Sequence, residues 1–86
     1  MELSDWRKRI DSLNLQLLEL LNDRARCALA IAELKKEKLL PVYDPVREKQ
    51  VFEAVLSQNK GPLSNEAVRS IFECIIAEHR LLEEKS

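Results

Sequence analysis

Glycine and proline are scarce in this 86-residue chain, which has one glycine and three prolines, none of them between Asp5 and Leu40. These two residue types interrupt helices most often. Their absence permits one helix over about residues 5–39, which would be roughly 50 Å long at ~1.5 Å per residue. A compact domain of this size has a smaller diameter. We therefore expect this helix to need covering surface from a second copy of the chain.

Long apolar runs and an excess of basic charge are also missing. No stretch approaches the ~20 apolar residues of a membrane span, and the N-terminal residues lack the apolar segment of a signal peptide. The chain has 14 basic and 15 acidic residues, for a net charge of -1, so it offers no concentrated basic face for duplex nucleic acid. We expect a cytoplasmic protein that binds neither nucleic acid nor membrane.

Cysteine is limited to two residues. Cys27 and Cys74 have no metal-ligand spacing and are too few for a disulfide scaffold. Both lie among apolar residues, so buried free thiols in a reducing cytosol are expected. The sequence also lacks a catalytic triad pattern and a glycine-rich phosphate loop. We predict neither a metal site nor a cofactor.

Helical periodicity is what the first half of the chain does contain. Residues at alternating spacings of three and four form a heptad-like seam with one polar member, Arg24: Trp6, Ile10, Leu13, Leu17, Leu20, Arg24, Cys27, Ile31 and Leu34. Further apolar residues widen this surface, namely Leu18, Leu21, Ala25, Ala28 and Ala32. The width favours a helix bundle over a bare coiled coil. Ser4 or Asp5 can cap the start of this helix.

Two shorter helices follow. Pro41 disfavours helical geometry in the residue before it, and Asp44-Pro45 is a strong start signal for a helix over about residues 45–59. A turn-like cluster then precedes Ser64, a plausible cap for a third helix over about residues 65–84. The prediction is one all-α domain over residues 1–86, with three helices in the order long, short, medium.

Three cations on the long helix suggest an anion site. Arg24 and Lys35 are eleven residues apart, which places them on one face with Cα atoms roughly 16 Å apart. A small dianionic ligand would fit between their side chains. Arg7 is about 25 Å from Arg24 along the axis and rotated by roughly 100°, so it cannot serve the same small site of the same chain. Any site that uses Arg7 must belong to a second protomer.

Each candidate residue also has an ordinary structural explanation. Arg7 and Lys35 lie in charged runs that water can solvate, whereas Arg24 occupies a position where leucine would be expected and needs a carboxylate partner. Asp44 can act simply as a helix cap. The sequence pattern alone leaves both a functional and a structural role open for four further residues, Arg47, Glu48, His79 and Glu83.

In this order and at these spacings, the residues resemble the all-helical chorismate mutase family. The resemblance covers nearly the whole chain and is carried by residues 7–13, residues 16–24, Lys35, residues 42–48 and residues 71–83. It implies an intertwined homodimer in which the two long helices span both subunits and each of two sites draws on both chains.

The resemblance also implies the reaction, a Claisen rearrangement of chorismate to prephenate on the way to phenylalanine and tyrosine. This pericyclic step needs no nucleophile, metal or redox cofactor. The enzyme would fold the flexible substrate and place donors at the ether oxygen, where negative charge grows as the bond breaks.

Site roles follow from the same resemblance, position by position. Arg24 and the partner subunit's Arg7 would hold the two substrate carboxylates, because the planar guanidinium binds a carboxylate bidentately. Lys35 would donate to the ether oxygen. The ring hydroxyl would be bound by Glu48, with contributions nearby from Asp44 and Arg47.

Two positions depart from the common family pattern. Glu83 stands where glutamine is frequent, and a carboxyl group can donate a hydrogen bond only when protonated. We therefore predict that activity rises toward acidic pH and that Glu83→Gln flattens this dependence. His79 stands where serine is common, and it either contacts a substrate carboxylate or fills space.

Other functions remain open at this stage. Isochorismate-pyruvate lyases resemble these mutases and use much the same cationic site. A non-catalytic helical dimerisation or regulatory module would explain the seam, but not the polar intrusion at Arg24 matched by Glu48 and Glu83. We expect no fused dehydratase or regulatory domain within these 86 residues. The sequence does not reveal whether a partner enzyme raises the activity.

Overall fold

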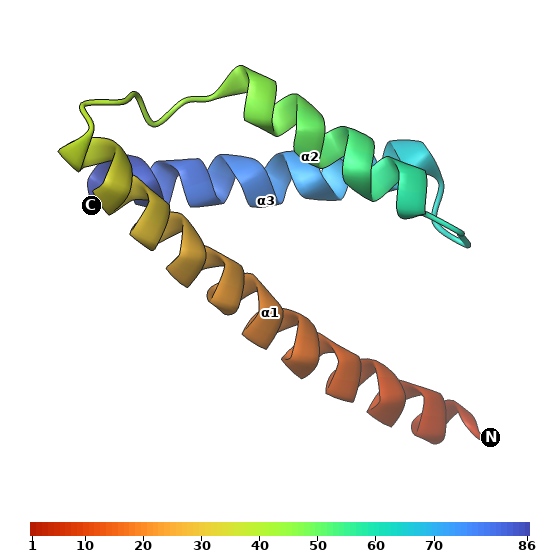
Figure 1. Ribbon diagram of the computed structural model, residues 1–86. Coiled ribbons are helices and arrows are strands. Elements are labelled where there is room, and N and C mark those ends of the chain that lie inside the picture. The colour runs from red at the N-terminus through yellow and green to blue at the C-terminus, as the bar shows by residue number, and fades with distance from the viewer.

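The computed structural model describes all residues from Met1 to Ser86 and contains three helices and no strand. Helix α1 spans Leu3–Glu37, α2 spans Pro45–Gln58 and α3 spans Asn65–Lys85 (Figure 1). The predicted all-α class and the long-short-medium order are confirmed. The helix ends differ from the expected ranges by no more than two residues.

The start of α1 differs from the expectation that Ser4 or Asp5 would be its cap. The helix begins at Leu3, and Glu2 is its N-cap. Asp5 lies in the first turn, where its Oδ2 accepts a hydrogen bond from the backbone N–H of Glu2 at 2.8 Å. A carboxylate at this position binds back to the residue before the helix, so the helix starts earlier than a cap at residue 4 or 5 allows.

The end of α1 is a tight reversal that glycine usually forms. The N–H of Leu40 donates to the carbonyl of Lys35 at 2.8 Å, and the N–H of Leu39 donates to the carbonyl of Lys36 at 3.2 Å. This is the Schellman pattern, which requires a left-handed backbone at its central residue. Leu39 adopts that conformation with φ of 55°. Pro41 follows two residues later, as expected after a helix end.

The starts of α2 and α3 are capped as predicted. The Oδ1 of Asp44 accepts from the N–H of Arg47 at 3.0 Å, and Pro45 is the first helical residue of α2. The Oγ of Ser64 accepts from the N–H of Ala67 at 3.1 Å. Each short polar side chain thereby satisfies a backbone donor that the first helical turn leaves without a partner.

The three helices form an open arrangement in which α3 is the common support. Helices α1 and α2 both pack against α3, whereas the Cα atoms of α1 and α2 stay more than 8 Å apart. The C-terminal half of α1 lies along α3, and its N-terminal half projects away from the other helices (Figure 1). The molecule therefore measures 55 × 24 × 15 Å. Only Ala28, Ala32 and Ile76 are buried, and each keeps a small exposed fraction of 4–8%.

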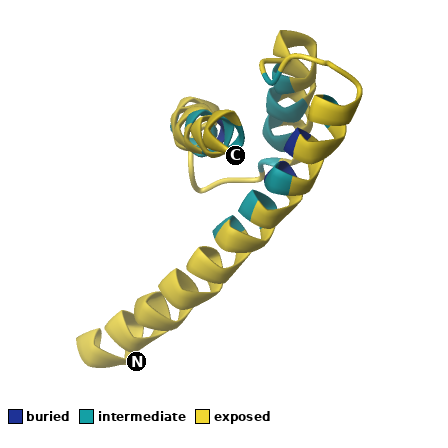
Figure 2. Cartoon of the chain, turned by 90° about the vertical axis from the view of Figure 1, so that its left-hand side faces the viewer, coloured by how far each residue is buried: buried dark blue, intermediate teal, exposed yellow.

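The projecting half of α1 leaves its apolar seam uncovered (Figure 2). Trp6 is 55% exposed, Leu17 53% and Leu20 64%, although all three occupy seam positions. Cys27 and Cys74 are exposed as well, so the expectation of buried thiols is wrong for the single chain. Its three helices cover only part of each other's surface. None of the three helices combines the length and the hydropathy that a membrane span requires.

Candidate active site

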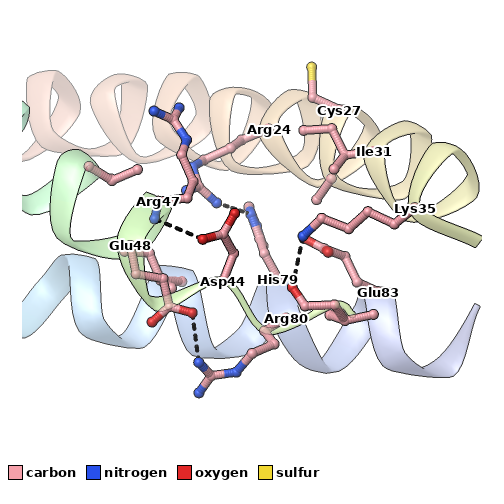
Figure 3. Close-up of a pocket in the computed structure, with 14 residues that line it drawn as sticks. Arg24, Cys27, Ile31, Lys35, Asp44, Arg47, Glu48, His79, Arg80 and Glu83 are labelled. Carbon is pink, nitrogen blue, oxygen red and sulfur yellow. Dashed lines mark hydrogen bonds and ion pairs between the residues drawn. The ribbon is translucent and has the colours of Figure 1, made fainter. Parts of the chain in front are cut away.

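One cavity of about 240 Å³ lies between the C-terminal half of α1, the connector after it, the start of α2 and the C-terminal half of α3. Its apolar lining consists of Cys27, Ala28, Ile31, Val42, Val51 and Ile76. Its titratable lining consists of Arg24, Lys35, Asp44, Arg47, Glu48, His79, Arg80 and Glu83 (Figure 3). Four basic side chains thus face three carboxyl groups, which makes the cavity suitable for an anion.

Every predicted site residue except Arg7 lines this cavity. Arg7 lies near the start of the projecting half of α1, and it is exposed. Arg7 is far from the cavity because α1 has 35 residues and only its C-terminal half lines the cavity. The structure therefore brings the other predicted residues together within one chain and leaves Arg7 outside.

Arg24 is held by His79 across the α1–α3 interface. The Nη1 of Arg24 lies 2.6 Å from the Nδ1 of His79. Arginine has no acceptor, so Nδ1 must accept and the proton of the neutral ring lies on Nε2. Burial, together with the Arg24 charge, lowers the pKa of His79. The neutral imidazole thus orients the guanidinium, while Nε2–H remains a further donor.

Lys35 is oriented by the connector that follows α1. Its Nζ donates to the backbone carbonyl of Val42 at 2.8 Å. An ammonium group has three donors, so this bond leaves two for a ligand. The side chain extends along the cavity toward α3 (Figure 3). Lys35 is therefore a fixed point charge at one end of the cavity.

Glu83 lies on α3 at the same end of the cavity (Figure 3). Burial raises the pKa of Glu83; the Lys35 and Arg24 charges oppose this shift, and the negative charges of Glu48 and Glu84 add to it. Burial has the largest effect, because a carboxylate loses hydration there. Glu83 therefore holds its proton to a higher pH than an ordinary glutamate, and in that form it can donate a hydrogen bond.

The start of α2 supplies the remaining predicted residues. Asp44 caps the helix through its bond to the Arg47 backbone, and both side chains line the cavity. The Oε2 of Glu48 accepts from the Nη1 of Arg80 at 2.7 Å, and the two side chains are 25% and 33% exposed. The start of α2 is thus joined to α3 by an ion pair at the wall of the cavity.

Arg80 is the cavity residue that the sequence interpretation missed. Its guanidinium carbon also lies 5.0 Å from the centre of the Tyr43 ring, a cation–π distance. The spacing in the sequence could have identified Arg80, since it follows the buried Ile76 by four residues and precedes Glu83 by three. At that spacing the three side chains share one face of a helix.

Metal-binding clusters are not part of this site. No group of three or more His, Cys, Asp or Glu side chains in the molecule is arranged to hold a metal ion. The arrangement that the cavity does contain is a set of fixed cations, one neutral imidazole and one glutamate whose proton is retained more strongly than usual. Such a set can bind carboxylates and place hydrogen-bond donors at a developing negative charge.

A known protein family matches nearly the whole chain. The family model described as chorismate mutase type II matches residues 6–84. A bifunctional chorismate mutase/prephenate dehydratase from Pseudomonas aeruginosa is 43% identical over 88 residues, which cover 96% of this chain and 24% of that protein. The chain thus spans about a quarter of the length of this curated relative.

Solved structures give a similar result at full length. The chorismate mutase (Form II) of Thermus thermophilus has a TM-score of 0.95 and 35% identity, with 96% of this chain and 94% of that chain covered. The Helicobacter pylori chorismate mutase in complex with prephenate has a TM-score of 0.89 and 29% identity, with 96% and 90% covered. The three-helix arrangement and the sequence therefore agree in pointing to the same proteins.

Proposed function

Because the chain belongs to the chorismate mutase type II family, we propose that it catalyses the rearrangement of chorismate to prephenate in phenylalanine and tyrosine biosynthesis. The observation that carries this proposal is the placement of Arg24 and Lys35 on one wall of a cavity whose opposite walls bear Glu48 and Glu83. The Helicobacter pylori relative was solved with prephenate, which supports a small dicarboxylate as ligand.

Binding would begin with the carboxylates. Arg24 would bind one of them through its planar guanidinium, which His79 already orients at 2.6 Å. Orientation of Arg24 before binding is favourable, because a guanidinium that is already fixed loses little conformational freedom when the substrate binds. The reaction is unimolecular, so holding the enolpyruvyl arm over the ring supplies a large part of the catalysis.

Transition-state stabilisation would come from Lys35 and Glu83. As the carbon–oxygen bond breaks, negative charge grows on the ether oxygen, and donors fixed there bind the transition state more strongly than the substrate. Lys35 has two donors left after its bond to Val42. Glu83 adds a third donor when protonated, which its raised pKa favours. The ring hydroxyl would donate to Glu48, with Asp44 and Arg47 contributing nearby.

The proposed active form is an intertwined homodimer. The seam of α1 is exposed along the projecting half, and an apolar stripe of this length on a monomer indicates an interface. A second α1 packed on the seam would cover it. The second substrate carboxylate would then be bound by the partner subunit's Arg7, since this chain's own Arg7 is outside its cavity. The proposed location is the cytoplasm.

Prephenate formation from chorismate is the direct test. Wild-type protein should form prephenate, and Arg24→Ala should lose most of that activity while it keeps its helical circular dichroism spectrum. Isochorismate is supplied in a separate reaction. If the protein forms salicylate and pyruvate from isochorismate but no prephenate from chorismate, it is an isochorismate-pyruvate lyase and the mutase proposal is wrong. No turnover of either compound would favour a non-catalytic module.

A further inference from the structure

Arg80 joins three parts of the molecule at the wall of the cavity. Its Nη1 donates to the Oε2 of Glu48 on α2 at 2.7 Å, and its guanidinium covers the Tyr43 ring of the connector at 5.0 Å. Arg80 itself belongs to α3. One side chain on the supporting helix therefore contacts both the connector and the first turn of α2.

The first turn of α2 needs such a contact. Helix α2 packs against α3, and the Cα atoms of α1 and α2 stay more than 8 Å apart, so the two backbones stand on opposite sides of the cavity. The connector is fixed to α1 by the bond from Lys35 to the carbonyl of Val42. Arg80 fixes the next residue, Tyr43, and the start of α2 from the opposite side.

The hydrogen bond from Arg80 uses only one of the two carboxylate oxygens of Glu48. Oε2 accepts from Arg80, whereas Oε1 has no hydrogen-bond partner in the protein, and the Glu48 side chain is 25% exposed at the cavity wall. A carboxylate bound at one oxygen by a fixed guanidinium has few orientations left for the other. Because Glu48 lines the cavity, Oε1 is the carboxylate oxygen left for a ligand.

We propose that Arg80 is a positioning residue, which holds Glu48 so that its free carboxylate oxygen accepts the hydroxyl of the substrate. This inference rests on the proposed function, because it concerns the binding of a hydroxyl-bearing substrate in that cavity. Arg80 acts through Glu48 and does not itself bind the substrate. The hydroxyl group is present in the substrate and the transition state alike, so loss of Arg80 should raise KM more than it lowers kcat.

Arg69 offers a matched control on the same helix. Its guanidinium carbon lies 4.8 Å from the centre of the Phe52 ring of α2, much as Arg80 lies over Tyr43. Arg69 has no hydrogen bond to a carboxylate and does not line the cavity. Replacing Arg69 therefore removes a cation–π contact between α3 and α2 without touching Glu48.

The test is a double-mutant cycle with chorismate as substrate, using Arg80→Met, Glu48→Ala and both together. Arg80→Met should raise KM about tenfold, as expected for a lost hydrogen bond to a charged group, with a smaller change in kcat. In the Glu48→Ala background, which has no acceptor for Arg80, the same change should have less than about a twofold effect. Arg80→Lys should recover part of the loss, and Arg69→Met should keep wild-type constants.

Three outcomes would overturn the inference. Equal effects of Arg80→Met in both backgrounds would show that Arg80 acts independently of Glu48. Equal effects of Arg69→Met and Arg80→Met would show a purely structural role. Wild-type constants for Arg80→Met would show no role. Arg80→Gln takes its place in the cycle if Arg80→Met does not fold. Wild-type protein without chorismate turnover is a separate result, which refutes the proposed function and this inference with it.

Discussion

The two halves of α1 have similar sequence patterns and different surroundings. In the C-terminal half, Ala28 and Ala32 are only 6% and 4% exposed, because α3 packs against them. In the N-terminal half, Leu18 belongs to the same set of residues flanking the seam and is 56% exposed. The seam itself is exposed in both halves, with Leu17 53% and Ile31 48% exposed. Periodicity thus identifies the face that needs covering, but it does not identify the chain that covers it.

Polar residues divide in the same way. Arg24 and Lys35 lie in the packed half, and each is already oriented by a partner from the same chain. Arg7 lies in the projecting half, outside the cavity. One half of α1 thus builds a site within the chain, whereas the proposed dimer assigns the seam and the cation of the other half to a neighbour. Substitutions in each half should separate these two roles.

The largest effect is expected from a charge in the projecting seam. Leu17→Asp should convert the proposed dimer to monomers and abolish most of the activity, because each protomer would lose a buried leucine worth about 2 kcal/mol and place a carboxylate in the interface. With two copies per dimer, the dissociation constant should rise by about 10²-fold or more. Sedimentation velocity measures the oligomeric state, and activity measured over a range of protein concentrations shows whether it depends on the dimer.

Leu15→Asp is the control for that change. Leu15 is 69% exposed and lies on the opposite face of α1 from the seam, two residues from both Leu13 and Leu17. This variant should keep the mass and activity of the wild type. If Leu17→Asp also sediments as the wild type does, the projecting seam is not the dimer interface.

The next largest effect is expected from the packed half. Arg24→Ala should lower kcat/KM by about 10²–10³-fold, since it removes a preformed donor to a substrate carboxylate. The oligomeric state and the helical content should stay unchanged, which distinguishes this variant from Leu17→Asp. A loss of less than about threefold in a prephenate assay would contradict the assigned role of Arg24.

A smaller effect is expected from the protonation of Glu83. Its pKa is raised, mainly by burial, so the protonated donor form becomes more populated as the pH falls toward that pKa. We expect log kcat/KM to rise with decreasing pH by up to about one unit per pH unit, as for one proton. Glu83→Gln should flatten this rise, because the amide donates at every pH.

His79→Ser separates the second titrating group. The pKa of His79 is lowered by burial and by Arg24, and protonation of Nδ1 would break the bond to the Arg24 guanidinium. Activity should therefore fall where His79 becomes protonated on the acid side, and His79→Ser should remove that fall but keep the rise due to Glu83. An unchanged profile in Glu83→Gln would exclude Glu83 as the donor.

The smallest effect concerns the junction where α1 ends. Leu39 has a φ of 55° and is 92% exposed, so Leu39→Gly removes backbone strain without loss of packing. Relief of the strain should raise the free energy of unfolding by about 1 kcal/mol. The greater conformational entropy of glycine in the unfolded chain offsets part of this gain. Urea denaturation at fixed protein concentration measures it. Leu40→Gly, at a residue without positive φ, should lower the stability instead.

Much of the fold was predictable because its signals are local. The Asp44-Pro45 start and the Ser64 cap act within one helical turn, and the structure has the expected hydrogen bonds at both places. The start of α1 was predicted two residues too late, because the carboxylate of Asp5 binds backward and not as a cap. Burial of the cysteines was predicted wrongly, since periodicity does not tell how much of a helix its neighbours cover.

The site was predictable only in part. Residue types and spacing pointed to Arg24 and Lys35, and the family resemblance added five further residues. All seven line one cavity: Arg24, Lys35, Asp44, Arg47, Glu48, His79 and Glu83. Their partners were not predictable, because the Arg24–His79 contact joins residues 55 apart and the Glu48–Arg80 pair joins residues 32 apart. Such pairs depend on the angle and register at which helices pack, which no local pattern specifies.

The sequence by itself determined three helices, their order, their caps and the positions where charge interrupts an apolar face. Those features depend on hydrogen bonds and side-chain spacing within a few turns. Tertiary structure alone decided that α3 would support both other helices, that Arg80 would hold Glu48 and that half of α1 would remain uncovered. These are long-range results of packing, in which free energy depends on contacts between distant parts of the chain.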